Sequence, residues 1–181
     1  TDPAEAWTRH ILDSLTLVPL IASVRSEVGQ ASVPAVPIQV IDIGSGGGLP
    51  GIPLAIVLRD VQFTLLEATG KKARFLQETA AALNLANVRV INDRAEILGQ
   101  DHKHHREHYD IVIARAVGRM TTLLELTIPF AKVGGLVLAM KGAQAESEIA
   151  EARQALHMLH AHLIDRRTTA TGVIVGIEKQ R

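Results

Sequence analysis

The chain has 181 residues, of which 47% are apolar and 21% charged, as is typical of one soluble globular domain with its own core. Lys and Arg together number 19, as do Asp and Glu, so the formal net charge of zero excludes a general polyanion binder with a basic excess. The absence of cysteine excludes disulfides and cysteine-ligated zinc, and no apolar run reaches the roughly 20 residues that span a bilayer. We therefore expect a soluble cytoplasmic protein with no membrane segment.

The first part of the chain predicts a helix. Asp2 is a capping residue, Pro3 suits the first helical position, and apolar residues then recur on one helical face: Trp7, Ile11, Leu12, Leu15 and Val18. We expect Pro19 to end this helix and the small, polar residues that follow to form a connection. Residues 1–37 are thus predicted to be an N-terminal helix and connection packed on the core.

Strands and helices alternate through the middle of the chain. Short β-branched runs predict buried strands, and apolar residues three and four apart predict helices. In chain order, these patterns predict a strand at 38–43, a helix at 52–58, a strand at 61–66, a helix after Gly70, strands at 88–91 and 109–114, a helical face over 120–131, a strand at 135–140 and a helix over 145–159. This alternation is typical of parallel βαβ units with right-handed crossovers.

The end of the chain breaks the alternation. Two strands, near 163–167 and 172–178, have no room for a helix between them, so they are predicted to pair antiparallel. The fold class is therefore α/β: a Rossmann-like, doubly wound sheet of seven strands, mostly parallel with an antiparallel C-terminal hairpin, preceded by an N-terminal helical extension. Residues 38–181 are predicted to form the sheet domain, in a chain with a single domain overall.

A glycine-rich turn separates the first strand from its helix. Between Asp42 and Gly51, glycine stands at five positions: 44, 46, 47, 48 and 51. Glycine lets the backbone turn sharply and lets a ligand approach without a Cβ in the way. Ligands of open α/β sheets bind at the carboxyl ends of the strands. The turn therefore predicts a ligand site.

The nature of that ligand has two interpretations. Residues 46–51 satisfy G-x-G-x-x-G, and Glu67 lies about 20 residues further on, as in a dinucleotide site. The second interpretation is a methyltransferase site, in which an acid at the same position holds ribose hydroxyls. Neither feature therefore distinguishes a dinucleotide site from a methyltransferase site. Pro50 and Pro53 are poorly suited to the start of a helix that binds a pyrophosphate through its amide groups. The antiparallel hairpin also resembles the methyltransferase sheet. S-adenosylmethionine is therefore favoured, with a nicotinamide-dependent oxidoreductase as the alternative.

Six segments, spread in order over nearly the whole chain, resemble a known protein family more specifically than the glycine turn alone does: residues 9–15, 42–54, 66–72, 93–96, 114–117 and 141–142. Together they resemble the bacterial small-subunit (16S) ribosomal RNA guanine-N7 methyltransferases, the glucose-inhibited division protein B family. The Gly-Leu-Pro-Gly-Ile-Pro turn and the Arg-Ala-Val segment are more specific than a glycine loop alone. Members of that family carry additional N-terminal sequence, so we expect the chain to be shortened at this end.

This resemblance implies transfer of a methyl group from S-adenosylmethionine to N7 of a guanine in 16S ribosomal RNA. It also implies the roles of individual residues. The turn would line the cofactor, the end of the second strand would meet its ribose and adenine, and the segment after the third strand would flank the adenine. Arg115 would sit beside cofactor and target base. The implied cofactor-binding residues are Gly44, Gly46, Gly48, Leu49, Glu67, Ala68, Thr69, Ala95, Glu96 and Arg115.

Such a reaction needs little acid–base catalysis. Guanine N7 attacks with a bare lone pair, so an in-line displacement on a sulfonium needs no general base and no metal. We therefore expect no catalytic acid or base, with Arg115 as a candidate for positioning. Two alternatives stay open beside the oxidoreductase: a methyltransferase of the same fold with another substrate, and a non-catalytic ribosome-assembly factor.

Basic residues follow several of the predicted strand ends. They could contact RNA phosphates around the cleft: Lys71, Lys72, Arg94, Arg119 and Lys141. The predicted partner is small-subunit ribosomal RNA or the small subunit itself, and we expect a monomer. Four histidines crowd residues 102–108, but charged residues lie among them, so we expect a solvated surface and no metal site.

Overall fold

The computed structural model describes residues 7–28 and 36–181. One sheet of seven strands runs through the molecule in the order β3-β2-β1-β4-β5-β7-β6. The strands are β1 (Gln39–Ile43), β2 (Gln62–Leu66), β3 (Val88–Ile91), β4 (Tyr109–Arg115), β5 (Ala131–Lys141), β6 (Ala161–Thr168) and β7 (Val173–Lys179). Strands β1 to β5 pair in parallel, and β7 runs antiparallel to both β5 and β6. The predicted fold class is confirmed.

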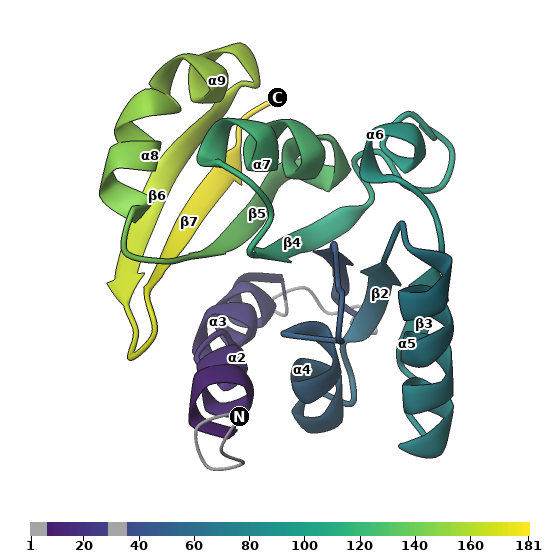
Figure 1. Ribbon diagram of the computed structural model, residues 1–181. Helices are drawn as coiled ribbons and strands as arrows, with labels where there is room; N and C mark the ends of the chain where they lie inside the picture. Colours follow the sequence, from purple (N-terminus) through teal and green to yellow (C-terminus); the bar gives the residue numbers. More distant parts are fainter. Residues whose placement is uncertain (1–6, 29–35) are drawn as a thin grey trace.

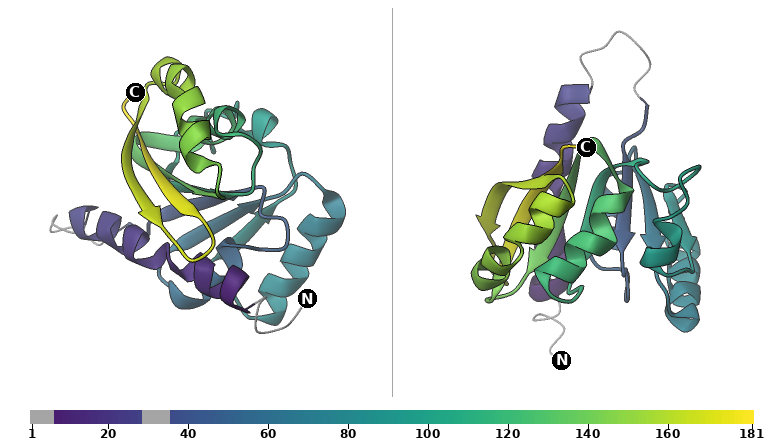
Figure 2. Two further views of the ribbon diagram at one scale, coloured as in Figure 1. Left: turned by 60° about the vertical axis from the view of Figure 1, so that its left-hand side comes forward. Right: turned by 90° about the horizontal axis from the view of Figure 1, so that it is seen from above.

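Helices cover both faces of this sheet, in three layers (Figures 1 and 2). Helices α4 (Gly51–Val57) and α5 (Gly70–Ala82) pack on one face, together with the N-terminal helix α3 (Val18–Val28). The opposite face carries α6 (Ala95–Leu98), α7 (Met120–Thr127), the 3-10 turn η2 (Ile128–Phe130), α8 (Ala145–Glu151) and α9 (Arg153–Met158). The single predicted helix over 145–159 is thus broken at Ala152, where α8 ends and α9 begins.

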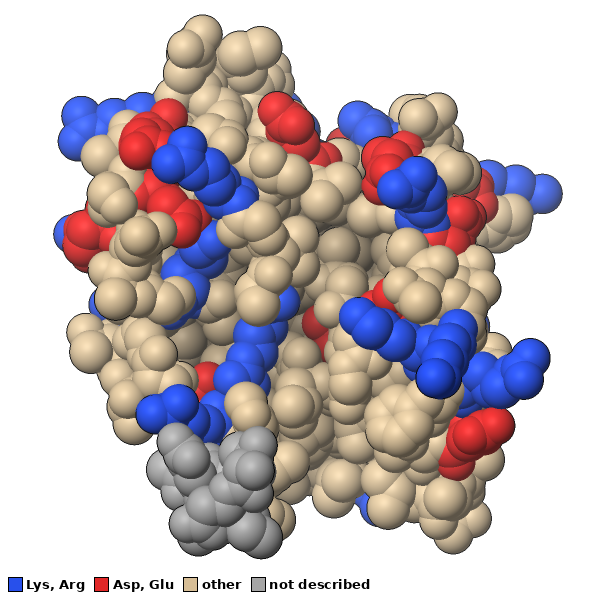
Figure 3. All heavy atoms as spheres, viewed as in Figure 1, with Lys and Arg blue, Asp and Glu red and all other residues tan. Residues whose placement is uncertain are grey.

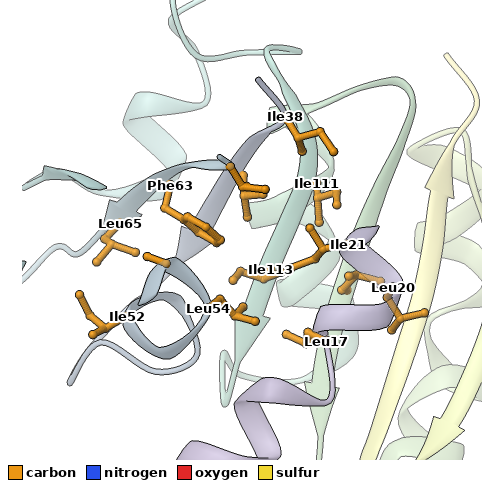
Figure 4. Packing of buried hydrophobic residues seen from close by; sticks show 14 of the residues in the cluster. Leu17, Leu20, Ile21, Ile38, Ile52, Leu54, Phe63, Leu65, Ile111 and Ile113 are labelled. Carbon is orange, nitrogen blue, oxygen red and sulfur yellow. The ribbon is translucent and has the colours of Figure 1, made fainter. Parts of the chain in front are cut away.

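The alternation of side chains along the strands produces two cores. Val40 faces the layer of α3, α4 and α5, while its neighbour Ile41 faces α7. Figure 4 shows the first of these cores, in which side chains from helices and strands meet: Leu17, Leu20, Ile21, Ile38, Ile52, Leu54, Phe63, Leu65, Ile111 and Ile113. Burial of this apolar surface on both sides fixes the register of the sheet.

The N-terminal segment differs from the prediction. A π-helical turn η1 (Trp7–Leu12) leads into the short α2 (Asp13–Leu15), and α3 begins just after it. Pro19 therefore lies in the first turn of a helix, where its missing N–H leaves no hydrogen bond unmade, instead of ending one. The break after α2 also changes the buried face: Leu17 is buried, whereas Trp7 is 58% exposed. The predicted cap at Asp2 and Pro3 lies outside the described residues.

The parallel strands bring their carboxyl ends to one edge of the sheet. This edge carries the residues that follow Ile43, Leu66, Ile91, Arg115 and Lys141. Because β7 runs antiparallel to β5 and Val173 pairs with Lys141, the turn between β6 and β7 lies at the same edge. None of the helices within 7–28 and 36–181 is long and apolar enough to cross a membrane.

Candidate functional site

The glycine-rich turn lies at the carboxyl edge, directly after β1. The N–H groups of Gly44 and Ser45 donate to the carbonyl of Leu66 at 2.9 and 3.1 Å, which ties the turn to the end of β2. Gly44 and Gly46 have φ values of 71° and 55°, which glycine adopts without a steric penalty. A Cβ added at Gly47 would meet nothing within 4 Å. The turn is therefore fixed at its base and open on its outer side.

Two further glycines in the turn are needed for packing. Gly48 is buried with φ of 90°, and a Cβ there would come within 2.7 Å of Ile52 Cγ1. At Gly51, a Cβ would lie 2.4 Å from Leu65 Cδ2. The structure therefore places Gly48, predicted to line a cofactor, where it allows the turn to pack on the core. Leu49 beside it is half-buried.

Glu67 is the first residue after β2 and faces the turn. Its Oε2 accepts the Gly46 N–H at 2.9 Å and its Oε1 accepts the Thr69 N–H at 2.8 Å. Burial by itself would raise the pKa of Glu67, but these two backbone hydrogen bonds and nearby Lys72 lower it below its usual range. A carboxylate has about four lone-pair positions, so each oxygen retains one for a ligand. Glu67 is thus a fixed, ionised acceptor of hydrogen bonds.

Asp42, the fourth residue of β1, lies beneath the turn and is 1% exposed. Its Oδ2 accepts the Gly51 N–H at 3.2 Å, while its Oδ1 has no partner among the described residues. Burial raises the pKa of Asp42 to about 7, against the hydrogen bond from Gly51, which lowers it. No separate role is predicted for this residue from the sequence. It binds the start of α4 to β1 and so holds the turn in place.

We expect Asp42 to make folding stability decrease as the pH rises. The pKa is 3.8 when the group is solvated and about 7 in the folded protein, so between these values the folded state holds a proton that the unfolded state has released. The stabilisation is complete below about pH 4 and is lost as the pH approaches 7. Asp42→Asn should therefore flatten the pH dependence of urea unfolding between pH 4.5 and 7.5 by about 2–4 kcal/mol. Parallel profiles for both proteins would contradict this role.

The start of α4 offers no free amide to an anion. The N–H of Gly51 donates to Asp42, that of Ile52 to the Gly48 carbonyl at 2.7 Å, and Pro53 has none. Leu54 donates to the Pro50 carbonyl at 3.3 Å. A dinucleotide site depends on free amides at this position to hold its pyrophosphate. The geometry therefore argues against the dinucleotide interpretation.

The residues after β2 and β3 lie next to each other at this edge. Asn92, which the sequence did not single out, donates from Nδ2 to the carbonyls of Glu67 and Ala68 at 2.8 and 3.1 Å. Ala68 and Thr69 are exposed, and Ala95 is half-buried at the start of α6. Glu96 is exposed and pairs with Arg94 at 3.1 Å. The predicted adenine-side residues are thus brought to one place, beside Glu67.

Arg115 ends β4 and is held by the N-terminal segment. Its Nη2 donates to the Arg9 carbonyl at 2.9 Å and lies 3.2 Å from His10 Nδ1, while the Asp13 carboxylate lies 3.7 Å away. Its Nη1 is buried without a partner in the described ranges. The other Asp13 oxygen accepts from Thr169 in the β6–β7 turn at 3.1 Å. Residues 9–13, which carry part of the family resemblance, therefore anchor Arg115 at the site.

Lys141, at the end of β5, is placed differently from the other predicted RNA contacts. Its side chain is 6% exposed, and its Nζ lies 2.6 Å from Glu148 in α8 and 2.7 Å from the Gly118 carbonyl. An ammonium so close to a carboxylate is poorly placed to bind a phosphate, because the carboxylate repels the anion. Sequence reasoning missed Glu148, although its position three residues after buried Ala145 puts it next to the inner face of α8.

The other basic candidates are accessible. Lys71 and Lys72, in the first turn of α5, are exposed, as is Arg94. Arg119 is also exposed and lies 3.6 Å from Glu151. Figure 3 shows Lys and Arg side chains gathered on both sides of a hollow in the middle of one face. An overall neutral chain can thus present a locally basic rim.

The histidine-rich segment has structural partners. His104 pairs with Asp101 at 3.1 Å, and buried His105 lies 2.8 Å from the Tyr109 hydroxyl. Burial lowers the pKa of His105. Over the part of the chain that the structure describes, no group of three or more His, Asp or Glu side chains could hold a metal ion.

The chain is similar to a known protein family and to individual relatives. The model of a protein family described as rRNA small subunit methyltransferase G (GidB) matches residues 1–171. A "Ribosomal RNA small subunit methyltransferase G" from Sorangium cellulosum is 47% identical over 179 residues, which cover 99% of this chain and 70% of that protein. One from Roseiflexus castenholzii is 43% identical over 164 residues, or 91% of this chain and 64% of that protein. The chain spans about two thirds of the length of such relatives.

Solved structures share the fold at low sequence identity. M. jannaschii TYW2 in complex with AdoMet has a TM-score of 0.62 and 20% identity, covering 88% of this chain and 75% of that one. A SAM-dependent O-methyltransferase from Thermotoga maritima has a TM-score of 0.61 and 15% identity, covering 88% of this chain and 65% of that one. At these identities the likeness shows the fold alone.

Proposed function

Because the chain belongs to the rRNA small subunit methyltransferase G (GidB) family, we propose that it transfers a methyl group from S-adenosylmethionine to N7 of a guanine in 16S ribosomal RNA. One observation carries the choice of cofactor: the Glu67 carboxylate is held by two backbone N–H groups beside an open glycine turn, with lone pairs left for a diol. The adjoining helix has no free amide for a pyrophosphate.

The residues at the carboxyl edge fit this cofactor. Glu67 would accept hydrogen bonds from the ribose hydroxyls, and the open backbone of Gly46 and Gly47 would lie along the ligand. The exposed or half-buried residues after β2 and β3 would flank the adenine: Ala68, Thr69, Ala95 and Glu96. When bound, S-adenosylmethionine supplies a methyl group activated by its sulfonium. The turn's Gly44 and the end of β4 would border the reacting end.

The protein's contribution to the reaction is positioning. Guanine N7 has a bare lone pair and no proton to lose, so no side chain has to act as a base. Arg115 is the candidate for positioning, because its Nη2 contacts Arg9, His10 and Asp13 and its Nη1 has no partner among the described residues. Orienting two reactants in one site can supply about 7–11 kcal/mol of the barrier reduction.

The substrate is proposed to be small-subunit ribosomal RNA, engaged through the exposed basic rim. Lys71, Lys72 and Arg94 would contact phosphates around the cleft. We place the enzyme in the cytoplasm, where such RNA is found. We also propose that the protein acts as a monomer.

The test is incorporation of labelled methyl from S-adenosylmethionine into RNA of small subunits that lack base methylation, with NADH binding measured in parallel by calorimetry. We expect label in the RNA and no NADH binding. Tight NADH binding without S-adenosylmethionine binding would favour an oxidoreductase. Cofactor binding with no labelled RNA would favour another substrate or an assembly factor without turnover.

The basic rim gives a separate prediction. Lys71→Ala together with Lys72→Ala should weaken binding to small subunits about tenfold at low salt and reduce its salt dependence, because two phosphate contacts are lost. Binding to S-adenosylmethionine should change by less than about threefold, since the contacts of Glu67 with Gly46 and Thr69 remain. Lys103→Ala, an exposed lysine before the amino end of β4, is the control. Equal losses for the double variant and the control would refute the assignment.

A further inference from the structure

A hollow adjoins the glycine turn, at the carboxyl ends of β4 and β5. Its volume is about 290 Å³, and it is lined by Ala116, Met140, Lys141, Gly142, Gln144 and Glu148. Ala116 precedes Val117, whose Cγ2 lies 3.3 Å from the Cβ position of Gly44 in the turn. A Cβ on Gly142 would meet nothing within 4 Å, so this side is open. The hollow therefore neighbours the proposed cofactor site.

Two of the polar side chains that line the hollow, Lys141 and Glu148, form a largely buried ion pair whose hydrogen-bonding capacity is not fully used. Lys141 Nζ gives one N–H to the Gly118 carbonyl and one to Glu148, which leaves a third of its three donors. Glu148 Oε2 accepts from Lys141 and from the Met120 N–H at 2.9 Å. Its Oε1 has no partner among the described residues. The pair thus offers one donor and one carboxylate acceptor side by side.

This pattern matches one nucleobase edge. The Watson–Crick edge of guanine presents the O6 acceptor beside the N1–H and N2–H donors, whereas adenine presents an N6–H donor beside the N1 acceptor. We propose that Lys141 and Glu148 read guanine: Lys141 donates to O6 and Glu148 Oε1 accepts from N1–H and N2–H. Guanine N7 lies on the other edge of the base, free to react. This inference rests on the proposed function and names the residues that select its base.

The environment of Lys141 favours a base over a phosphate. A phosphate in the hollow would approach the Glu148 carboxylate, 2.6 Å from the ammonium, and be repelled by it. A neutral base that carries both donors and an acceptor can instead form hydrogen bonds with both Lys141 and Glu148. A buried ion pair also adds little net stability on average, so its placement at this edge is better explained by recognition than by folding.

The test compares GMP and AMP, which carry the same phosphate and ribose. In the wild-type protein, calorimetric titration should show GMP binding at least about tenfold more tightly than AMP, as a good two-bond base contact provides. IMP, which lacks the N2 amino group, should fall between them. In Glu148→Gln, the amide oxygen must stay with Lys141 and the Met120 N–H, so the NH2 group faces the hollow. It opposes guanine N1–H and suits adenine N1, so the preference should vanish or reverse.

The control is Glu146→Gln on the same helix, an exposed residue that pairs with Arg166 and should leave the GMP preference unchanged. Equal or absent binding of GMP relative to AMP by the wild type, or an unaltered preference in Glu148→Gln, would overturn the proposal. The wild-type comparison does not depend on any variant folding. Methylation of small subunits is measured separately. An enzyme that labels RNA yet shows no GMP preference would refute the role of Lys141 and Glu148 in guanine recognition, but not the proposed methyl transfer.

Discussion

Glu67→Gln is expected to raise the Kd for S-adenosylmethionine about 100-fold, because each hydrogen bond to a carboxylate contributes about 1.5–3 kcal/mol. Both Glu67 oxygens accept backbone N–H groups, from Gly46 and from Thr69. A glutamine NH2 must face one of these donors, so that contact and the ribose contact on the same side are both lost. Titration calorimetry of the folded protein measures the effect directly.

The matched control for this change is Glu78→Gln, an exposed glutamate on α5, for which we expect no change in cofactor affinity. Circular dichroism should show that the Glu67 variant keeps its secondary structure. An affinity within threefold of the wild type would remove Glu67 from the cofactor site. It would also leave the two backbone contacts as a purely structural feature of the turn.

Gly48→Ala should lower the free energy of unfolding by about 3–5 kcal/mol, the largest stability effect we expect in the turn. Its φ of 90° is outside the range that an alanine adopts without strain. The new Cβ would also lie 2.7 Å from Ile52 Cγ1 and 3.2 Å from Leu76 Cδ2. The core of α4 and α5 would have to move to accept it. Urea denaturation measures the loss.

The neighbouring glycine provides the control for backbone strain. At Gly47 a Cβ meets nothing within 4 Å, so Gly47→Ala should leave stability unchanged or raise it by up to about 1 kcal/mol. Similar losses for the two variants would mean that the turn is sensitive to any side chain. In that case the packing of Gly48 against α4 and α5 would not be the cause.

The sheet was predictable because its signal is local. Runs such as 38–43 and 109–114 are apolar on both faces, and the structure buries Val40 and Ile41 on opposite sides. The glycine turn was predictable for the same reason, since three of its glycines have positive φ values that side chains rarely adopt. Both features are determined by residues that are consecutive in the sequence.

The parts that could not be predicted depend on contacts between distant residues. Pro19 is compatible with either end of a helix, and only the packing of Leu17 and Ile21 on the sheet decides which. The buried Lys141 is predicted to be a surface cation because nothing in the sequence pattern shows that Glu148 in α8 becomes its partner. Arg115 likewise meets residues more than 100 positions earlier in the chain.

The measurement that tests the central claim most directly is nucleoside analysis of 16S RNA after reaction with S-adenosylmethionine. The substrate is small subunits that lack base methylation, and mass spectrometry identifies the modified nucleoside. We predict a single new 7-methylguanosine in reactions with the wild-type protein and a strongly reduced amount with Glu67→Gln. A methyl group on another atom or another base, or no methylated nucleoside although the cofactor binds, would contradict the proposed reaction.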